Sequence, residues 1–114
     1  MPPLAALGRR TKQRVGRGKE AIDGRLDLHG LTQREAHTTL LRFLQAASHR
    51  DARLVLVITG KGAGNGERGV LKRQVPQWLE LPEFRKWVIG FENAHVAHGG
   101  DGALYVQVRR GKRS

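Results

Sequence analysis

The chain has 114 residues, no cysteine and a formal net charge of +11 at pH 7, with a pI of about 11.4. This length predicts one domain with a single modest core, and without cysteine a disulfide framework and a thiolate zinc site are excluded. The excess of Lys and Arg predicts a polyanionic partner, nucleic acid first and an anionic membrane surface second. No apolar run could span a bilayer or act as a secretion signal, so we expect a cytoplasmic protein whose partner is nucleic acid and not a membrane.

Residues 1–21 are predicted to be a basic, disordered N-terminal arm, because few side chains there could build a core. Its cations are Arg9, Arg10, Lys12, Arg14, Arg17 and Lys19. Such an arm can follow phosphates without sequence preference; the alternatives are a solvated tail or the remnant of a longer N-terminal region. A short basic tail is expected over residues 111–114, which leaves residues 22–110 as the folded domain.

The first predicted strand ends in the segment 26–30, Leu-Asp-Leu-His-Gly. Apolar and polar residues alternate there with the period of a half-buried strand, so Asp27 and His29 should project together from the face opposite the leucines. A carboxylate can orient an imidazole and raise its basicity, which makes this pair the candidate for acid–base catalysis. The same pattern also fits a surface strand with two polar side chains.

Thr32 and Glu35 form a capping box that predicts the start of a helix, and apolar residues follow at helical spacing. His37 and His49 lie outside the apolar stripe and are expected on the solvated surface. Residues 54–58 are all apolar, which is typical of a strand buried on both faces in the centre of a sheet. A strand, a helix and a second strand in this order predict a right-handed crossover with parallel pairing.

A glycine-rich loop, residues 59–69, follows the buried strand. Glycines let a backbone approach a ligand closely, and the next helix should begin near Val70 with free amides that can bind an anion. Lys61 and Arg68 add positive charge, so the loop suits a phosphate; the alternative is a surface loop without a ligand. The loop contains a G-x-G-x-x-G match, but it begins beyond the strand end, and the chain is too short for a dinucleotide fold.

The second helix contains Pro76, which should kink it or shorten its first segment. Further strands are expected over residues 87–91 and 103–109. The resulting order predicts a two-layer α/β sandwich, a four-stranded mixed sheet with two helices on one face (βαβαββ). Ligands of such sheets bind at the carboxyl ends of parallel strands, so the acid–base pair and the glycine-rich loop are expected to be neighbours.

Residues 92–102 form a long predicted loop, and long loops are often functional. His95 and His98 have a spacing that can serve a metal ion, and with the histidine of the first strand they could form a metal-hydrolase site. No acidic or thiolate partner lies beside them at the usual ligand spacing, so we predict no metal site. His98 beside Gly99 and Gly100 can instead contact nucleic acid.

Three blocks of this sequence resemble the Smr (small MutS-related) domain, in its stand-alone bacterial form. They are residues 26–30, 59–62 and 98–106, and the likeness extends over residues 22–110. The resemblance implies a two-layer α/β sandwich similar to the C-terminal domain of bacterial translation initiation factor 3, in agreement with the predicted element order.

The resemblance also implies a nucleic-acid endonuclease, with the catalytic positions of the family on Asp27 and His29. Some members nick DNA, whereas stand-alone bacterial forms cleave mRNA on collided ribosomes; we therefore expect RNA as substrate and the ribosome as a partner. The alternatives are a DNA-nicking enzyme and a non-catalytic nucleic-acid- or ribosome-binding module. No cofactor is expected, except a divalent metal if the substrate is DNA. The residues expected to bind the nucleic acid are Thr59, Gly60, Lys61, Gly62, Arg68, His98, Gly99 and Gly100.

Overall fold

The computed structural model describes residue 16, residues 21–61 and residues 69–110. The basic arm, apart from residues 16 and 21, and the basic tail lie outside the described residues, as do the candidate residues Gly62 and Arg68. No helix in the described ranges is long and apolar enough to cross a membrane. The elements are β1 (Gly24–Asp27), α2 (Gln33–His49), β2 (Leu54–Ile58), α3 (Val70–Leu79), α4 (Pro82–Arg85), β3 (Val88–Asn93), the 3-10 turns η2 (Val96–His98) and η3 (Gly100–Gly102), and β4 (Ala103–Val108).

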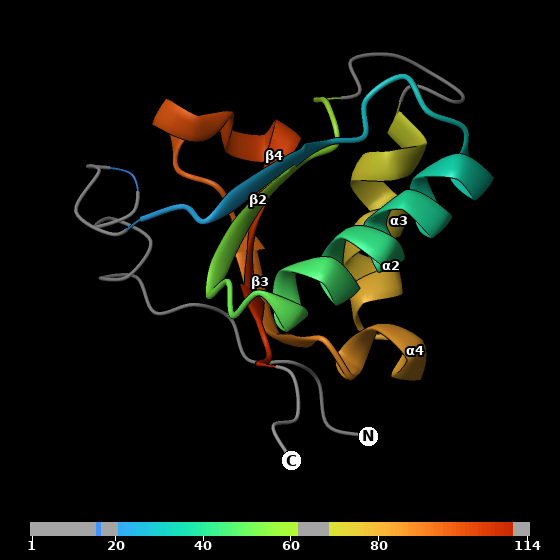
Figure 1. Ribbon diagram of the computed structural model, residues 1–114. Coiled ribbons are helices and arrows are strands. Elements are labelled where there is room, and N and C mark those ends of the chain that lie inside the picture. Colours follow the sequence, from blue (N-terminus) through green and yellow to red (C-terminus); the bar gives the residue numbers. More distant parts are fainter. Residues whose placement is uncertain (1–15, 17–20, 62–68, 111–114) are drawn as a thin grey trace.

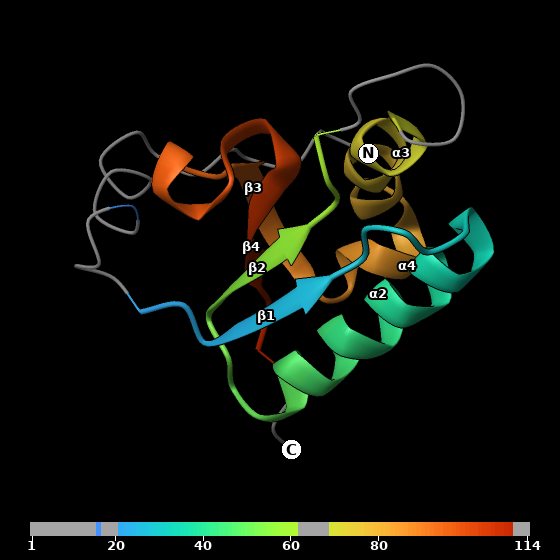
Figure 2. The ribbon, with the colours of Figure 1, turned by 90° about the horizontal axis from the view of Figure 1, so that it is seen from above.

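The four strands form one mixed sheet in the order β1-β2-β4-β3. Strand β1 is parallel to β2, and β4 is antiparallel to both β2 and β3. Figure 2 shows β1 beside β2 with both arrows pointing the same way, and Figure 1 shows α2, α3 and α4 together on one face of the sheet. The predicted two-layer sandwich is therefore confirmed, with the short helix α4 in addition to the two predicted helices.

The main core lies between the sheet and the helices. Val55 and Val57 of β2 and Leu40 and Leu44 of α2 belong to this core, and all four side chains are fully buried. Burial of one such side chain contributes about 1.5–3 kcal/mol relative to leaving it exposed. The apolar stripe predicted for α2 therefore packs the helix against the sheet.

Helix α2 begins at the predicted capping box. The Thr32 hydroxyl accepts a hydrogen bond from the Glu35 amide at 3.2 Å, and the Glu35 carboxylate accepts one from the Thr32 amide at 3.0 Å. The expectation that His37 is solvated is wrong: its ring is half-buried and lies edge-on to Trp78 and Phe84, each at a centroid distance of 5.1 Å. Helices α3 and α4 pack against this flank of α2, which the pattern of one helix alone does not reveal.

The structure gives further detail on two expectations about the second half of the chain. Pro76 lies inside α3, which is assigned as one helix from Val70 to Leu79. The third strand extends to Asn93, and the remaining residues of the expected loop form the turns η2 and η3. The predicted long loop is therefore mostly ordered backbone that leads from β3 back to β4.

A smaller apolar cluster covers the opposite face of the sheet, which none of α2, α3 and α4 covers and which is called the open face below. Leu56 and Tyr105 are fully buried or nearly so, and Leu54, Ala94 and Ala103 are also buried there. The turns η2 and η3, coloured orange in Figure 1, lie on this side of the sheet. Because apolar side chains cover both of its faces, β2 is a doubly buried central strand, as predicted.

Candidate active site

The carboxyl ends of β1 and β2 lie side by side, because these two strands are parallel neighbours. Strand β1 ends at Asp27, and the next amide, that of Leu28, donates to the carbonyl of Ile58 at 2.8 Å. The Leu28 side chain is fully buried. This anchor fixes the exposed residues on either side of it, Asp27 and His29, at the end of the sheet.

Asp27 and His29 form a hydrogen-bonded pair, as the alternation of the strand predicts. Nδ1 of His29 lies 2.5 Å from Oδ1 of Asp27, and the amide of His29 donates to the same oxygen at 3.0 Å. The side-chain hydrogen bond with His29 holds the pKa of Asp27 below its ordinary value, so the carboxyl group is ionised at neutral pH.

The protonation of Asp27 determines which nitrogen of His29 is free. Because an ionised carboxylate can only accept hydrogen bonds, Nδ1 carries a proton and, in the neutral ring, Nε2 keeps its lone pair. The side chain of His29 is 69% exposed and that of Asp27 is 49% exposed. The ring therefore offers a basic nitrogen to a ligand in solution, with the carboxylate behind it to stabilise an imidazolium.

Gly60 lies against this pair, and Gly102 holds the turn in place. The carbonyl of Gly102 accepts hydrogen bonds from the amides of Thr59 at 2.9 Å and Gly60 at 3.0 Å. Gly60 has a φ of +85°, and a Cβ atom there would lie 3.5 Å from Cβ of His29. A Cβ atom on Gly102 would lie 3.1 Å from the amide nitrogen of Lys61, so a side chain at this position would crowd the backbone of the turn.

The candidate for anion binding in the described part of the glycine-rich loop is the exposed side chain of Lys61. The amides of Thr59 and Gly60 are already bonded to Gly102, and the buried Thr59 hydroxyl lies 3.2 Å from the carbonyl of Gly60 and 3.4 Å from that of Gly102. Lys61 is exposed and directly follows this turn. Thr59 and Gly60 therefore stabilise the conformation of the turn, and Lys61 is the candidate residue for binding an anion.

The side chain of His98, another candidate residue for binding nucleic acid, is hydrogen-bonded to Tyr105. Nδ1 of His98 lies 2.7 Å from Oη of Tyr105, and the same oxygen accepts a hydrogen bond from the amide of His95 at 3.2 Å. Burial lowers the pKa of His98, and its electrostatic interactions with Arg25 and His95 lower it further. In a neutral His98, Nδ1 shares a hydrogen bond with the Tyr105 hydroxyl, and the tautomer of the ring sets which of the two groups donates.

Arg25 and Tyr105 also lie at the candidate site, although the sequence did not predict them as site residues. Arg25 lies two residues before Asp27 in β1, so both are on the open face, and the register places Arg25 and Tyr105 on either side of Leu56. The period of the strand could have identified Arg25. The contact between Tyr105 and His98 depends on how the turns before β4 fold, and no local pattern reveals it.

The other candidate residues between β3 and β4 are part of the turns η2 and η3. Gly99 and Gly100 have φ values of +112° and +53°, and they lead the chain from η2 into η3. Nδ1 of His95 accepts a hydrogen bond from the amide of Ala97 at 3.1 Å. Across the described ranges, no three or more His, Asp and Glu side chains are grouped so that they could hold a metal ion.

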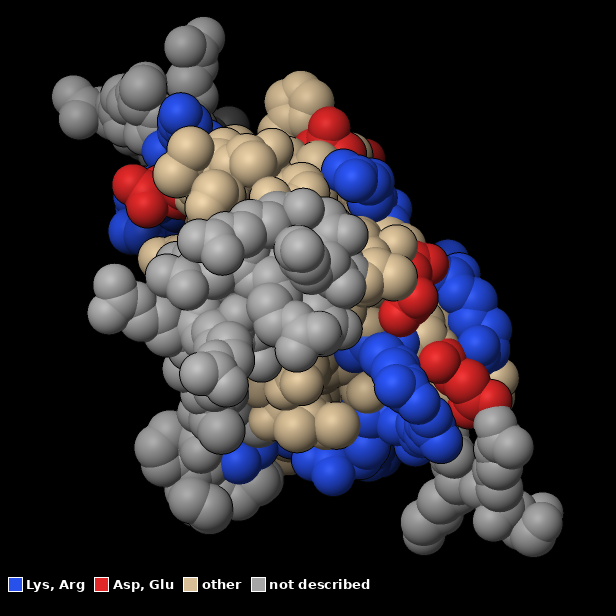
Figure 3. Space-filling model, turned by 90° about the vertical axis from the view of Figure 1, so that its left-hand side faces the viewer, with Lys and Arg blue, Asp and Glu red and all other residues tan. Residues whose placement is uncertain are grey.

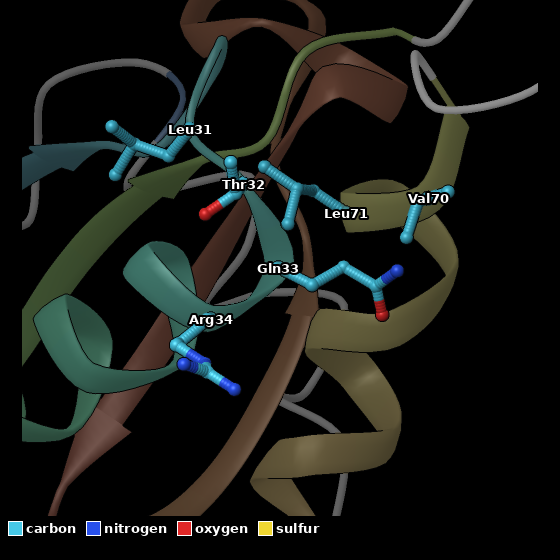
Figure 4. Close-up of a pocket in the computed structure, with 6 residues that line it drawn as sticks. All are labelled: Leu31, Thr32, Gln33, Arg34, Val70 and Leu71. Carbon is cyan, nitrogen blue, oxygen red and sulfur yellow. The ribbon is translucent and has the colours of Figure 1, made fainter.

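A pocket of about 270 Å³ opens between the N-terminal ends of α2 and α3. It is lined by Leu31, Thr32, Gln33, Arg34, Val70 and Leu71. Figure 4 shows Gln33 reaching from α2 towards α3 and Leu71 reaching from α3 towards α2. The pocket belongs to the helix layer, whereas Asp27 and His29 lie on the open face, so it adjoins the candidate site without containing the acid–base pair.

When His98 is replaced by glutamine, the protein should lose less folding stability at acid pH than the wild type does. A histidine whose pKa is lowered by folding binds a proton more readily when unfolded, so stability falls as the pH drops through the ordinary histidine range. Glutamine retains a hydrogen-bonding group for Tyr105 but does not titrate. Urea midpoints at about pH 7.5 and about pH 5.5 measure the effect. An equally large drop in the wild type and in His98→Gln would contradict this explanation.

Comparison with known proteins identifies relatives of this chain and of its fold. A family model described as the Smr domain matches residues 26–109. A ribosome rescue factor SmrB from Tolumonas auensis is 32% identical over 99 residues, which are 86% of this chain and 52% of the relative. The protein of the same name from Shewanella putrefaciens is 36% identical over 100 residues, 88% of this chain and 52% of the relative. The chain thus spans about half the length of the curated relatives it matches.

Two crystal structures share the fold. The Smr domain of Thermus thermophilus MutS2 has a TM-score of 0.63 and 27% identity, over 75% of this chain and 98% of that domain. YdaL, a stand-alone small MutS-related protein from Escherichia coli, has a TM-score of 0.72 and 27% identity, over 95% of this chain and 81% of its own. Both similarities cover most of the sheet and helices that carry the candidate site.

Proposed function

The chain belongs to the Smr domain family, and from this premise we propose that it is an endonuclease that cleaves RNA by acid–base catalysis. The observation that carries the proposal is the exposed, hydrogen-bonded pair of Asp27 and His29. Gly60 lies against this pair, with Lys61 next to it. Because the matched relatives are named ribosome rescue factors, we further propose that the RNA is bound to ribosomes in the cytoplasm.

In the proposed reaction His29 is the general base. Its Nε2 takes the proton of the 2′-hydroxyl next to the scissile phosphate, and the resulting oxygen attacks the phosphorus atom. The bond from phosphorus to the 5′ oxygen of the next nucleotide breaks, which leaves a 2′,3′-cyclic phosphate, and the departing oxygen takes up a proton from solvent. Asp27 holds the ring in the required tautomer and stabilises the imidazolium that forms.

Positive charge on the open face would stabilise the phosphate as the reaction proceeds. Lys61 follows the turn that contacts His29, so its ammonium group is the candidate for the oxygens of the scissile phosphate. Arg25 is exposed on the same face as Asp27 and can bind the phosphate of a neighbouring nucleotide. The attacking oxygen belongs to the substrate, so this route needs no metal-activated water.

Cleavage of three matched strands tests the proposal. We expect the protein to cleave a single-stranded RNA in EDTA, and to leave intact both the same strand with 2′-O-methyl groups and the same sequence in DNA. Cleavage that requires magnesium and ignores the 2′ substituent would instead support a hydrolytic enzyme that nicks DNA. Binding without new ends in any of these conditions would support a non-catalytic binding module.

A further inference from the structure

A second group of cations lies at the end of the sheet opposite to Asp27 and His29. This group, called the basic end, comprises Arg50, Arg53, Arg85, Lys86, Arg109 and Arg110. These residues come from the turn before β2, the chain before β3 and the chain after β4. Figure 3 shows Lys and Arg side chains gathered along the lower end of the molecule, with acidic side chains to one side.

Backbone hydrogen bonds bring these three segments together. The amide of Val108 donates to the carbonyl of Arg53 at 2.9 Å, and the amide of Arg109 donates to the carbonyl of Trp87 at 2.7 Å. The Ser48 hydroxyl, near the end of α2, donates to the carbonyl of Arg109 at 2.6 Å. Since neighbouring strands are about 4.8 Å apart, the cations form a row across the ends of β2, β4 and β3.

Two of the guanidinium groups are held by the protein itself. That of Arg109 donates to the carbonyls of Arg85 and Val88, each at 3.4 Å, and that of Arg50 donates to the carbonyl of Asp23 at 3.3 Å. These hydrogen bonds hold in place the backbone segments that carry the other cations of the basic end. Arg109 and Arg50 are therefore part of the support of the basic end.

Three cations of the row are free to bind a ligand. Arg53, Lys86 and Arg110 are exposed, and within the described residues their side chains form no hydrogen bond or ion pair. Asp23, Asp51 and Glu83 lie nearby, so the cations outnumber the acids. The Asp23 carboxylate is occupied, because it accepts from the amides of Arg53 at 2.8 Å and Leu54 at 3.2 Å.

We propose that the basic end is a second binding surface for the phosphates of the nucleic-acid substrate. Strand β2 has five residues, and at about 3.3 Å per residue it separates the two ends of the sheet by about 17 Å. One phosphate cannot bridge this distance, so only a strand of several nucleotides contacts both the basic end and His29. Arginine forks bind phosphate oxygens well, and such contacts position a strand without reading its sequence.

The consequence is a protein that anchors its substrate away from the bond it cuts. The inference rests on the proposed function in one respect, that the ligand is a nucleic acid. It differs from that proposal in its residues, since none of the three free cations contacts the acid–base pair. Loss of the basic end should weaken binding of long strands and leave the chemistry at His29 intact.

The test compares two triple variants of the full chain. Arg53→Ser/Lys86→Ser/Arg110→Ser removes the free cations of the basic end. The matched control, Arg42→Ser/Lys72→Ser/Arg73→Ser, removes three exposed charges from α2 and α3. Binding is measured by fluorescence anisotropy with 2′-O-methyl RNA and with DNA, each about 20 or about 4 nucleotides long, at several salt concentrations.

We expect the basic-end variant to bind the long strands at least about tenfold more weakly than the control, and its salt slope to flatten by about 2, since three contacts at about 0.7 each are lost. The short strands, which have fewer phosphates to contact both ends of the sheet, should lose less affinity than the long strands. Equal loss in both variants would overturn the inference in favour of a general charge effect. Unchanged binding would overturn it in favour of an acidic protein partner. A wild type that binds long strands through the basic end but cleaves none would contradict the proposed function alone.

Discussion

Replacement of His29 by alanine should abolish RNA cleavage and leave RNA binding nearly unchanged. The substitution removes Nε2, the proposed base, and a positioned base contributes about 10²–10⁴-fold to such reactions. The ring is 69% exposed and hydrogen-bonded to Asp27, so the fold depends little on it. Single-turnover cleavage of RNA measures the chemical step, and anisotropy with the uncleavable 2′-O-methyl strand measures binding.

His49 provides a matched control for this variant. It is also an exposed histidine, but it lies at the last residue of α2, with Nδ1 of its ring 2.7 Å from the carbonyl of Gln45. His49→Ala should cleave RNA at the wild-type rate. Full activity in His29→Ala would show that Nε2 is not the base, whereas equal losses in both variants would point to unfolding.

Replacement of Asp27 by asparagine should slow cleavage by up to about 10⁴-fold, the scale seen when the carboxylate behind a catalytic histidine becomes an amide. The pKa of Asp27 is lowered by its hydrogen bond with His29, so the carboxylate stays ionised from neutral to mildly acid pH and keeps the ring proton on Nδ1. An asparagine amide can donate to Nδ1, which moves the ring proton to Nε2 and occupies the base.

Binding separates this chemical role of Asp27 from a merely structural one. Asparagine removes a negative charge next to the substrate phosphates, so the variant should bind the uncleavable RNA as tightly as the wild type or more tightly. A structural collapse of the site would weaken cleavage and binding together. Weaker binding with an unchanged rate of the bound complex would contradict the assignment of Asp27.

The hydrogen-bonded pairing of Asp27 and His29 could be predicted from sequence because its geometry is local. Two residues on either side of Leu28 share a face of the strand by its period alone, and the buried leucine fixes them there. The parallel order of β1 and β2 then places the glycine-rich loop at the same end of the sheet. Periodicity and element order therefore account for the main layers of the fold and for the neighbourhood of His29 and Gly60.

The features that escaped prediction depend on contacts between distant segments. Gly102 lies more than forty residues beyond the turn that it stabilises. Its carbonyl accepts a hydrogen bond from the Gly60 amide, which the glycine-rich pattern predicts to be free for a phosphate. His37 is half-buried because α3 and α4 pack against it. The bond between His98 and Tyr105 and the convergence of the basic end also require the folded chain.

The chemistry of the new ends tests the central claim most directly. Wild-type protein and His29→Ala would be incubated with one RNA in EDTA, and the products identified by mass spectrometry. We predict 2′,3′-cyclic phosphate and 5′-hydroxyl ends from the wild type, and no cleavage by His29→Ala. Products with a 5′-phosphate, formed only with added metal and equally by both proteins, would contradict acid–base catalysis by Asp27 and His29.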